Sequence, residues 1–184
     1  MANQAKEQND ATLVSRTCEG DDDSFSELLR RYQRPVLNFV YRLLGNETEA
    51  EDVAQETFVR AYQHLADFDP RRKFSTWLFA LARNAAIDRL RYRQRHPTEE
   101  LSDIAAASLA RGPADEAATR EIGDEIAAAI QSLSEDQRTA IVLAEYHDLS
   151  YAEIAEIMDC SVKSVESRLY RAKAVLREKL RGLF

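Results

Sequence analysis

The stretch that most constrains the fold of this chain runs from Ser150 to Lys173 and reads as two short helices joined by a tight connection. Ser150 and Glu153 form a capping box, which satisfies two backbone donors at the start of a helix. Ser161 can cap the second helix, whose apolar residues recur at steps of three and four. This apolar seam consists of Val162, Val165, Leu169, Ala172 and Leu176. The spacing therefore predicts a helix-turn-helix.

The side of the second helix opposite the seam is polar and basic. It carries Lys163, Ser164, Ser167, Tyr170 and Arg171, with Arg168 beside them. A helix that is buried on one side and presents such residues on the other is typical of a recognition helix in the DNA major groove. The alternative interpretation is an ordinary amphipathic helix pair with a solvated charged face.

Composition favours an all-α protein. The 184 residues include only 5 Gly and 4 Pro, whereas Ala, Leu, Glu and Arg are abundant. No apolar run approaches the roughly 18 residues that a membrane helix needs. The N-terminus also lacks the apolar core of a signal peptide. We therefore expect a cytoplasmic protein.

The formal net charge of −7 argues at first against a nucleic-acid partner, but the charge is unevenly distributed. Residues 71–95 carry a net charge of +7 and residues 163–181 a net charge of +5, so the remainder is strongly acidic. Two basic islands on an acidic body predict two separate contacts with a polyanion. The acidic surroundings should limit indiscriminate DNA binding. The alternative for either island alone is a solvated charge run.

Apolar periodicity and capping signals predict further helices along the chain. The first ten residues are polar and are expected to fray, with a helix from Ala11. Pro35 permits a break or kink in the next helix, which Gly45 closes. Thr48 is expected to cap another helix, whose apolar residues are Val53, Ala54, Phe58, Val59 and Tyr62. In all, helices are expected from residue 11 and over residues 25–44, 48–65, 75–95, 121–133 and 135–146.

Residues 98–120 are rich in Ala, Ser, Glu and Asp, contain Gly112-Pro113 and are poor in large apolar side chains. A stretch of this length and composition predicts an interdomain linker. We therefore expect an all-α fold of two small helical domains joined by a flexible linker. The first domain is assigned to residues 1–97, the linker to 98–120, and a C-terminal helix-turn-helix domain to 121–184.

One flank of the helix predicted over residues 75–95 carries Trp77, Asn84, Asp88, Arg91 and Arg95. An aromatic ring beside an amide and guanidinium groups can stack on a base, hydrogen-bond it and hold the adjoining phosphates. Spacing alone favours the alternative that Trp77 is a core aromatic. Asn84 is harder to explain structurally, because Asn has a poor helix propensity.

Three blocks, taken in order, carry a resemblance to a known family. Residues 50–65 read AEDVAQETFVRAYQHL, residues 74–91 read FSTWLFALARNAAIDRLR, and residues 133–173 contain the predicted helix-turn-helix. The chain resembles bacterial RNA polymerase sigma factors of the sigma-70 family, in the small, two-domain extracytoplasmic-function (ECF) class. The first block resembles the segment that grips the clamp helices of the polymerase. The second resembles the segment that melts and reads the −10 promoter element, and the third the domain that reads the −35 element and docks on the flap.

The resemblance implies a protein that binds core RNA polymerase and directs promoter-specific initiation, reading the −35 element as duplex and the −10 element as melted single strand. It implies polymerase contacts by Asp52, Gln55 and Glu56. It implies −10 DNA contacts by Arg72, Lys73, Ser75, Trp77, Arg83, Asn84, Arg89 and Arg91. It implies −35 DNA contacts by Ser161, Lys163, Ser164, Glu166, Ser167, Arg168, Tyr170, Arg171 and Lys173. It also implies an inhibitory anti-sigma factor, expected to be membrane-linked.

One position departs from the commoner family pattern, in which a basic residue stands where this chain has Glu166. The carboxylate removes a phosphate or guanine contact but can accept a hydrogen bond from the amino group of cytosine. The docking mode is expected to be kept, whereas the −35 sequence preference is left open.

Two rival functions explain less of the chain. A helix-turn-helix regulator that binds its operator without polymerase, as a LuxR-like domain does, accounts for residues 134–176 but leaves the two earlier blocks without a use. An α-helical enzyme would need a nucleophile–base pair, a metal-spaced cluster or a glycine-rich phosphate loop, and the sequence offers none. Cys18 and Cys160 are too few and too far apart for a disulfide framework or zinc site, and each is expected to be reduced and partly buried. We therefore expect no enzyme activity, no cofactor and no metal.

Overall fold

The computed structural model describes residues 2–96, 116–147 and 149–182. Over these residues the protein is all-helical and contains no strand, which confirms the predicted fold class. The helices are α1 (Ala2–Cys18), α2 (Asp22–Leu44), α3 (Glu47–Gln63), α4 (Phe74–Arg95), α5 (Glu116–Gln131), α6 (Glu135–Tyr146), α7 (Tyr151–Ile157) and α8 (Val162–Lys179), with a short 3-10 helix, η1, over Leu65–Asp67. None of these helices is long and apolar enough to cross a membrane.

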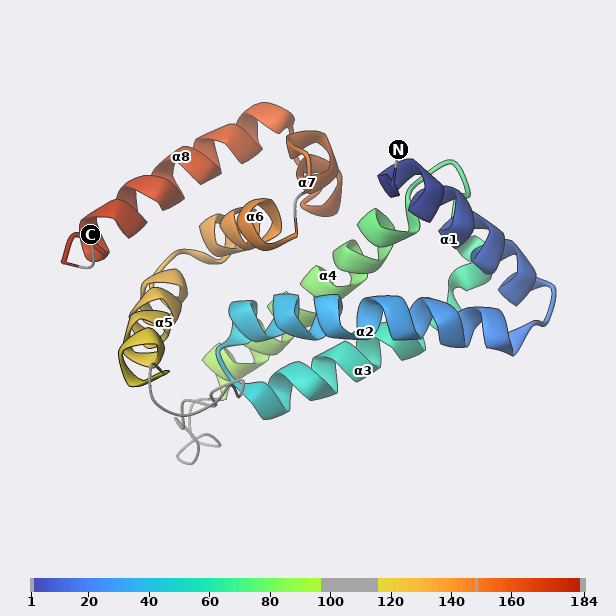
Figure 1. Cartoon of the computed structure of the whole chain (residues 1–184), viewed down its shortest axis with the longest axis horizontal. Coiled ribbons are helices and arrows are strands. Elements are labelled where there is room, and N and C mark those ends of the chain that lie inside the picture. Colours follow the sequence, from blue (N-terminus) through green and yellow to red (C-terminus); the bar gives the residue numbers. More distant parts are fainter. Residues whose placement is uncertain (1, 97–115, 148, 183–184) are drawn as a thin grey trace.

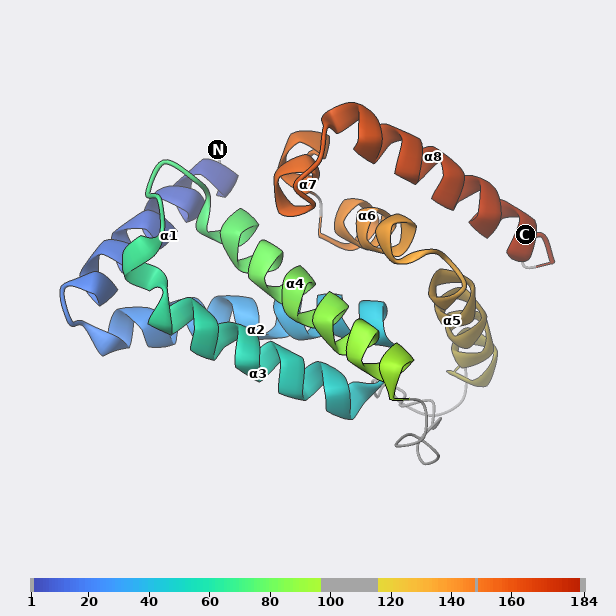
Figure 2. The same cartoon turned by 180° about the vertical axis from the view of Figure 1, so that it is seen from behind.

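The first domain is a bundle in which α2 packs against α1, α3 and α4 (Figure 1). α2 and α3 run side by side, and α4 crosses them, as Figure 2 shows from behind. Large side chains of α2 and α4 are fully buried between the helices, among them Leu28, Phe39 and Leu78. Full burial of a side chain of this size contributes about 1.5–3 kcal/mol. The tightly packed core therefore holds the exposed faces of α3 and α4 in a defined arrangement.

The second domain is built around α8, against which α6 and α7 pack. α7 and α8 form the predicted helix-turn-helix, with Asp159 in the turn at a φ of 49°. Val165, Leu169 and Ala172 of the predicted seam are buried. Val162, the first residue of α8, was also predicted to belong to the seam, but it is 42% exposed. The seam therefore begins one turn later than the sequence predicts.

Serine side chains begin α6, α7 and α8, as predicted. Ser150 and Glu153 form the capping box of α7, and Ser134 begins α6 in the same manner. The hydroxyl of Ser161 accepts a hydrogen bond from the backbone N–H of Ser164 at 3.2 Å and so caps α8. Each cap satisfies backbone donors that the first turn of a helix leaves unpaired.

The boundary between α2 and α3 differs in part from the prediction. Gly45 ends α2, as predicted, with a φ of 73°, a left-handed conformation that favours glycine. The predicted cap at Thr48 is wrong, because α3 begins earlier. Its N-cap is Asn46, whose side-chain oxygen accepts from the backbone N–H of Glu49 at 2.9 Å. Asn caps a helix as well as a hydroxyl residue does, so Asn46 takes the role that the prediction gave to Thr48.

Pro35 does not break the second helix. α2 is one element from Asp22 to Leu44 with Pro35 inside it. The neighbouring Tyr32 and Val36 are 4% and 0% exposed. Packing of these side chains against the rest of the bundle offsets the backbone hydrogen bond that proline removes.

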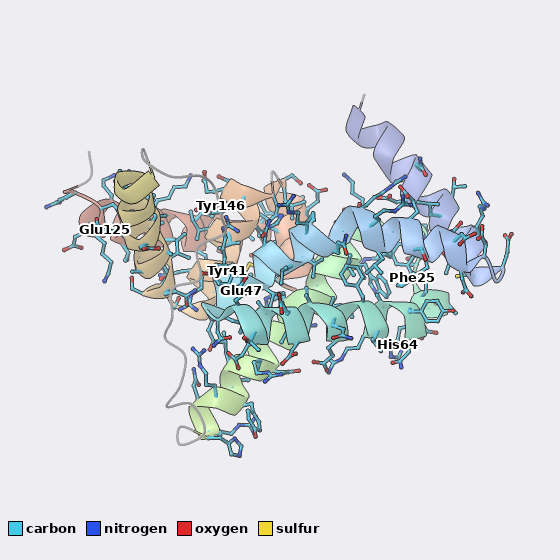
Figure 3. The ribbon with its side chains drawn as sticks, turned by 60° about the horizontal axis from the view of Figure 1, so that its bottom comes forward. Phe25, Tyr41, Glu47, His64, Glu125 and Tyr146 are labelled. Carbon is cyan, nitrogen blue, oxygen red and sulfur yellow. The ribbon has the colours of Figure 1, made fainter. Side chains whose placement is uncertain are left out.

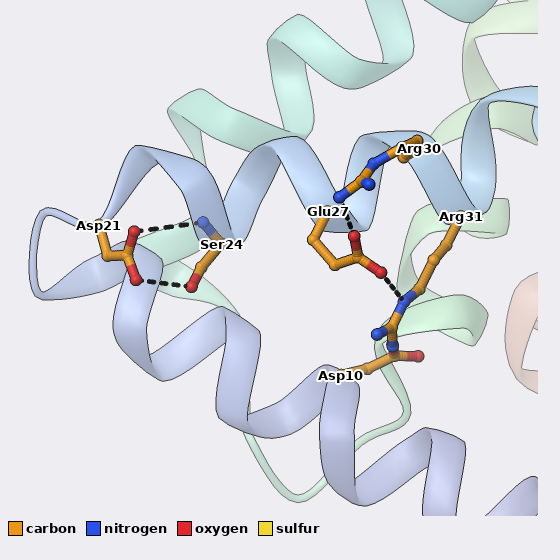
Figure 4. Close-up of polar contacts among 6 residues, drawn as sticks. All are labelled: Asp10, Asp21, Ser24, Glu27, Arg30 and Arg31. Carbon is orange, nitrogen blue, oxygen red and sulfur yellow. Dashed lines mark hydrogen bonds and ion pairs between the residues drawn. The ribbon is translucent and has the colours of Figure 1, made fainter.

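The N-terminal helix is longer than predicted, since α1 begins at Ala2 and not at Ala11. A buried carboxylate attaches it to α2: Asp10 is only 3% exposed and accepts hydrogen bonds from Tyr32 and, at 2.9 Å, from Arg31. Arg31 also donates to Glu27 at 2.8 Å (Figure 4). Burial and the hydrogen bond to Asp10 raise the pKa of Tyr32 above its ordinary value. The polar composition thus concealed only the first turns of this helix, residues 2–10.

The second domain packs on the first through the C-terminal end of α2. Arg138 donates to the carbonyl oxygen of Leu43 at 2.6 Å, and Gln131 donates to that of Arg42 at 2.9 Å. The guanidinium of Arg42 lies 4.0 Å from the centre of the Tyr146 ring, where α2 and α6 meet (Figure 3). The last carbonyls of a helix have no partner within it, so the second domain satisfies two carbonyls that α2 leaves unpaired.

Residues 98–115 of the predicted linker, which runs to residue 120, lie outside the described residues. α5 begins at Glu116, earlier than the predicted start at Glu121. Both cysteines are free; Cys160 is half-buried, whereas Cys18 is exposed, contrary to the prediction.

Candidate functional site

An apolar groove of about 590 Å³ lies between α2 and α3. Val59 and Tyr62, predicted to face inward, are each 49% exposed and line it. Phe25 of α2, labelled in Figure 3, meets the Tyr62 ring edge to face with 4.9 Å between ring centres. The remaining lining is Leu29, Gln33, Leu37, Glu51, Ala54, Gln55, Phe58 and Gln63. A contiguous apolar surface rimmed by polar groups is typical of a protein-docking site.

The three residues predicted to bind polymerase lie along the same side of α3. Asp52, Gln55 and Glu56 are exposed, and Gln55 itself lines the groove. Glu56 accepts a hydrogen bond from Arg60 at 2.5 Å. The sequence analysis missed the apolar half of this surface, although Val59 follows Gln55 by one helical turn and therefore shares its flank.

The predicted −10 contacts begin in the loop before α4. Arg71 donates to Asp69, and these hydrogen bonds lower the pKa of that carboxyl to about 2. Arg72 pairs with Glu156 of α7, and the Lys73 ammonium lies 3.0 Å from Glu153. Ser75, in the first turn of α4, is half-buried. Both predicted cations of this loop are thus paired with carboxylates of the second domain.

Trp77 belongs to an aromatic cluster. Its ring centre lies 5.2 Å from that of Phe68 and 5.8 Å from that of Phe74. Both phenylalanines are buried, and Trp77 is half-buried against them. The packing matches the core-aromatic alternative while leaving part of the indole accessible.

The remaining predicted −10 residues of α4 do not form one patch. Asn84 is exposed, and its oxygen accepts a long hydrogen bond of 3.4 Å from Arg83. The Arg83 side chain is only 16% exposed and points toward Asp136 of α6, 3.6 Å away. Arg89 instead lies 3.7 Å from Glu49 of α3. Asn84 therefore offers an accessible amide in the middle of α4.

Arg91 lies further along α4, where it is exposed and 4.0 Å from Asp88, which is also exposed. Such exposed pairs contribute at most about 1 kcal/mol. Arg91 is therefore free to exchange this partner for a phosphate.

The recognition helix α8 presents most of its predicted residues to solvent. Tyr170 is 79% exposed. Lys163, Glu166, Ser167 and Arg171 are exposed as well. Because α8 buries its opposite face, this set forms one accessible polar face of the second domain.

Four other predicted −35 residues have partners within the protein. Ser161 and Ser164 bond each other at the cap of α8, with 2.9 Å between their hydroxyl oxygens. Lys173 lies 2.8 Å from Glu145 of α6. Arg168 turns away from the exposed face and donates to Asp136 at 2.8 Å, and to the Cys160 sulfur at 2.9 Å.

No group of three or more His, Cys, Asp or Glu side chains that could hold a metal ion occurs in the part of the chain that the structure describes. The surface features that a partner could bind are instead the apolar groove between α2 and α3, the basic loop before α4 and the exposed polar face of α8.

Known proteins match both domains and their order. Residues 28–96 match sigma-70 region 2, and residues 123–176 match sigma-70 region 4. The sequence is 38% identical over 181 residues to the ECF RNA polymerase sigma factor SigW of Bacillus subtilis strain 168, covering 92% of this chain and 96% of SigW. The chain belongs to the ECF class of sigma-70 factors. It is therefore related to transcription initiation factors and not to a family of enzymes.

Other relatives of this sigma factor are similar over nearly their whole length. The ECF RNA polymerase sigma-E factor of Escherichia coli strain K12 is 36% identical, covering 95% of each chain. The structure of CnrH in complex with the cytosolic domain of CnrY matches with a TM-score of 0.73 and 31% identity, over 95% of this chain and 98% of that one. The sigma factor RpoE of Bartonella quintana, solved with the anti-sigma factor NepR, matches with a TM-score of 0.71 and 27% identity, over 85% and 96%.

Proposed function

We propose that this sigma factor directs core RNA polymerase to promoters by reading the −35 element as duplex with α8 and the −10 element as melted single strand with α4 and the loop before it. The observation that carries the proposal is the exposed polar face of α8, on which Ser167, Tyr170 and Arg171 stand opposite a buried seam. Such a helix can enter the major groove and bring these side chains to base edges. Residues 1–97 and 121–184 are taken as the two functional domains.

Single-strand capture couples recognition to melting. Extruding a base from the stack costs a few kcal/mol, which stacking and hydrogen bonds in a pocket can offset. Asn84 is an exposed hydrogen-bonding group in the middle of α4, and the loop cations Arg72 and Lys73 lie at the N-terminal end of that helix. Arg83, Arg89 and Arg91 are proposed to hold the adjoining phosphates. A trapped base favours the open strand over the duplex, so the polymerase receives a melted promoter.

The groove between α2 and α3 is proposed to receive the clamp helices of the polymerase, with Asp52, Gln55 and Glu56 at its polar edge. An amphipathic helix fits an apolar groove through residues on one of its faces. The second domain is proposed to dock on the flap. An anti-sigma factor, expected to be membrane-linked, would inhibit the protein by covering these faces. In support, the Bartonella RpoE was solved with the anti-sigma factor NepR, and CnrH with the cytosolic domain of CnrY.

Run-off transcription with purified core polymerase and a promoter library tests the proposal. We expect wild-type protein to enable initiation at a subset of promoters, and Arg171→Ala to weaken promoter engagement by about 5- to 150-fold, since a bidentate base contact is worth about 1–3 kcal/mol. Arg177→Ala, an exposed arginine near the end of the same helix, is the matched control. Wild-type protein that leaves core unable to start at any promoter would exclude the proposed function.

The carboxylate of Glu166 is expected to set the −35 preference. It is exposed on α8, next to Ser167. Glu166→Arg exchanges an acceptor suited to cytosine for a donor suited to guanine, so the selected −35 sequences should change while promoter opening is kept. The measurement uses a promoter library in which each −35 sequence is linked to a barcode downstream of the start site, and the barcodes are sequenced in the transcripts. An unchanged preference would remove Glu166 from the base-reading set.

A further inference from the structure

The guanidinium of Arg168 is bound within the second domain itself. Its Nη1 donates to the sulfur of Cys160, in the turn before α8, at 2.9 Å. Its Nη2 donates to Asp136, in the first turn of α6, at 2.8 Å. The Arg168 side chain is only 24% exposed. Both terminal nitrogens of this arginine are therefore engaged by groups of the protein.

These two hydrogen bonds join the recognition helix to α6 and to the turn that follows α7. Both of these helices pack against α8 (Figure 1), whose buried seam includes Val165 and Leu169. Apolar contacts are non-directional, so the seam holds α8 close to its neighbours but permits small rotations about the helix axis. Hydrogen bonds are directional, and a charged donor or acceptor strengthens them. The bonds of Arg168 therefore restrict the rotation of α8.

The residues proposed to read bases share this part of α8. Ser167 directly precedes Arg168, and Arg171 follows it by three residues, within one helical turn. Both neighbours are exposed. A base contact requires its side chain to be held within about 0.5 Å of the productive position, and a rotation of α8 moves every side chain on its exposed face. The orientation that Arg168 gives the helix therefore affects the contacts that its neighbours can make.

We propose that Arg168 is a positioning residue for −35 recognition: bonded to Asp136 and Cys160, it sets the orientation of α8 in the major groove and does not itself contact DNA. The inference rests on the proposed function of α8, and it differs from the DNA contact that the sequence resemblance implies for Arg168.

The two roles of Arg168 predict opposite effects of Asp136. A DNA contact by the guanidinium would have to compete with the Asp136 carboxylate, so removal of the carboxylate would strengthen binding. In the positioning role the carboxylate supports recognition, so its removal weakens the discrimination between −35 sequences.

The test uses holoenzyme assembled from core polymerase and the full chain. Fluorescence anisotropy measures its affinity for two promoter fragments that differ only in the −35 element, one with the sequence selected from the promoter library and one with that sequence scrambled. The ratio of the two affinities is the −35 discrimination. A smaller fraction of folded protein lowers both affinities equally and leaves this ratio unchanged. An effect of Asp136 through Arg83 of the first domain, 3.6 Å away, cancels in the same way.

The variants are Asp136→Asn and Arg168→Gln, singly and together, with Glu135→Gln as the matched control. Glu135 is the neighbouring carboxylate in the first turn of α6, and it accepts a hydrogen bond from Gln94 of α4 at 3.4 Å. We expect each single variant to lower the discrimination about two- to fivefold through loss of the ion pair. The double variant should be no worse than Arg168→Gln alone, because both changes remove the same interaction. Glu135→Gln should keep the wild-type ratio.

The salt dependence of binding distinguishes the two roles independently. A side chain that neutralises one phosphate contributes about 0.9 to the magnitude of the slope of log affinity against log salt concentration. Arg168→Gln should therefore leave the slope for the selected promoter unchanged. A slope smaller by about 0.9, or an Asp136→Asn variant that discriminates at least as well as the wild type, would overturn the proposal. Wild-type holoenzyme that binds both fragments equally would instead exclude the proposed reading of the −35 element by α8.

Discussion

Val59→Asp should abolish stable binding of this sigma factor to core polymerase. Val59 is half exposed and lines the groove between α2 and α3, so the substitution adds a carboxylate to the surface proposed to receive the clamp helices. Burying an unpaired carboxylate against an apolar partner costs several kcal/mol. A central interface residue contributes about 2 kcal/mol or more, so we expect a loss of affinity of at least about 30-fold.

Because Val59 lies at the surface, loss of polymerase binding by Val59→Asp can be distinguished from unfolding of the variant. Val59 is not part of the buried core, so the variant should keep the thermal stability and the helical circular dichroism of the wild type. Ile122→Asp is the matched control, because Ile122 is an apolar residue of α5 with 43% exposure and lies outside the groove. Binding to labelled core is measured by fluorescence anisotropy. Equal affinities for Val59→Asp and wild type would show that polymerase docks elsewhere.

Asn84→Ala should form few open complexes even when it is saturated with core polymerase. Asn84 is exposed in the middle of α4, and the amide is the group proposed to hydrogen-bond the extruded base. A good bidentate hydrogen-bonded contact between a side chain and a base is worth about 1–3 kcal/mol, which predicts a loss of about 5- to 150-fold. Permanganate footprinting of unpaired thymines at the −10 element measures the open fraction.

Asn84→Ala should stabilise α4 slightly, so the variant should fold as well as the wild type does. Alanine has a higher helix propensity than asparagine by several tenths of a kcal/mol, and Asn84 makes only one long hydrogen bond to Arg83 among those described for it. Loss of melting therefore cannot be attributed to loss of α4. Asp88→Ala, one turn further along the helix and also exposed, is the control. Wild-type opening by Asn84→Ala would assign base capture to other residues.

Local signals explain what could be predicted from sequence. A capping serine followed by a glutamate acts within four residues, so the starts of α7 and α8 were identified from Ser150, Glu153 and Ser161 alone. The left-handed end of α2 at Gly45 is likewise a property of one residue. Helix periodicity then gave the all-α class and the helix-turn-helix.

Contacts between distant residues explain what could not be predicted. Val59 and Tyr62 have the periodicity of core residues, and only the packing of α2 against α3 shows that they line an open groove. The buried Asp10 lies in a polar stretch, and its burial depends on Arg31 and Tyr32 of another helix. The side chain of Arg138 reaches a carbonyl of α2 that is 95 residues away in the sequence. No periodic pattern within a helix encodes such partners.

Gly45 affects both the end of α2 and the packing of α5 against it. Its backbone conformation ends α2, and its missing side chain leaves room for Gln131 of α5, whose Cδ would lie 3.0 Å from a β-carbon at residue 45. A methyl group there would strain the turn and also displace the Gln131 amide, which donates to the carbonyl of Arg42. The residue that ends a helix in one domain thus also leaves space for a hydrogen bond donated by the other.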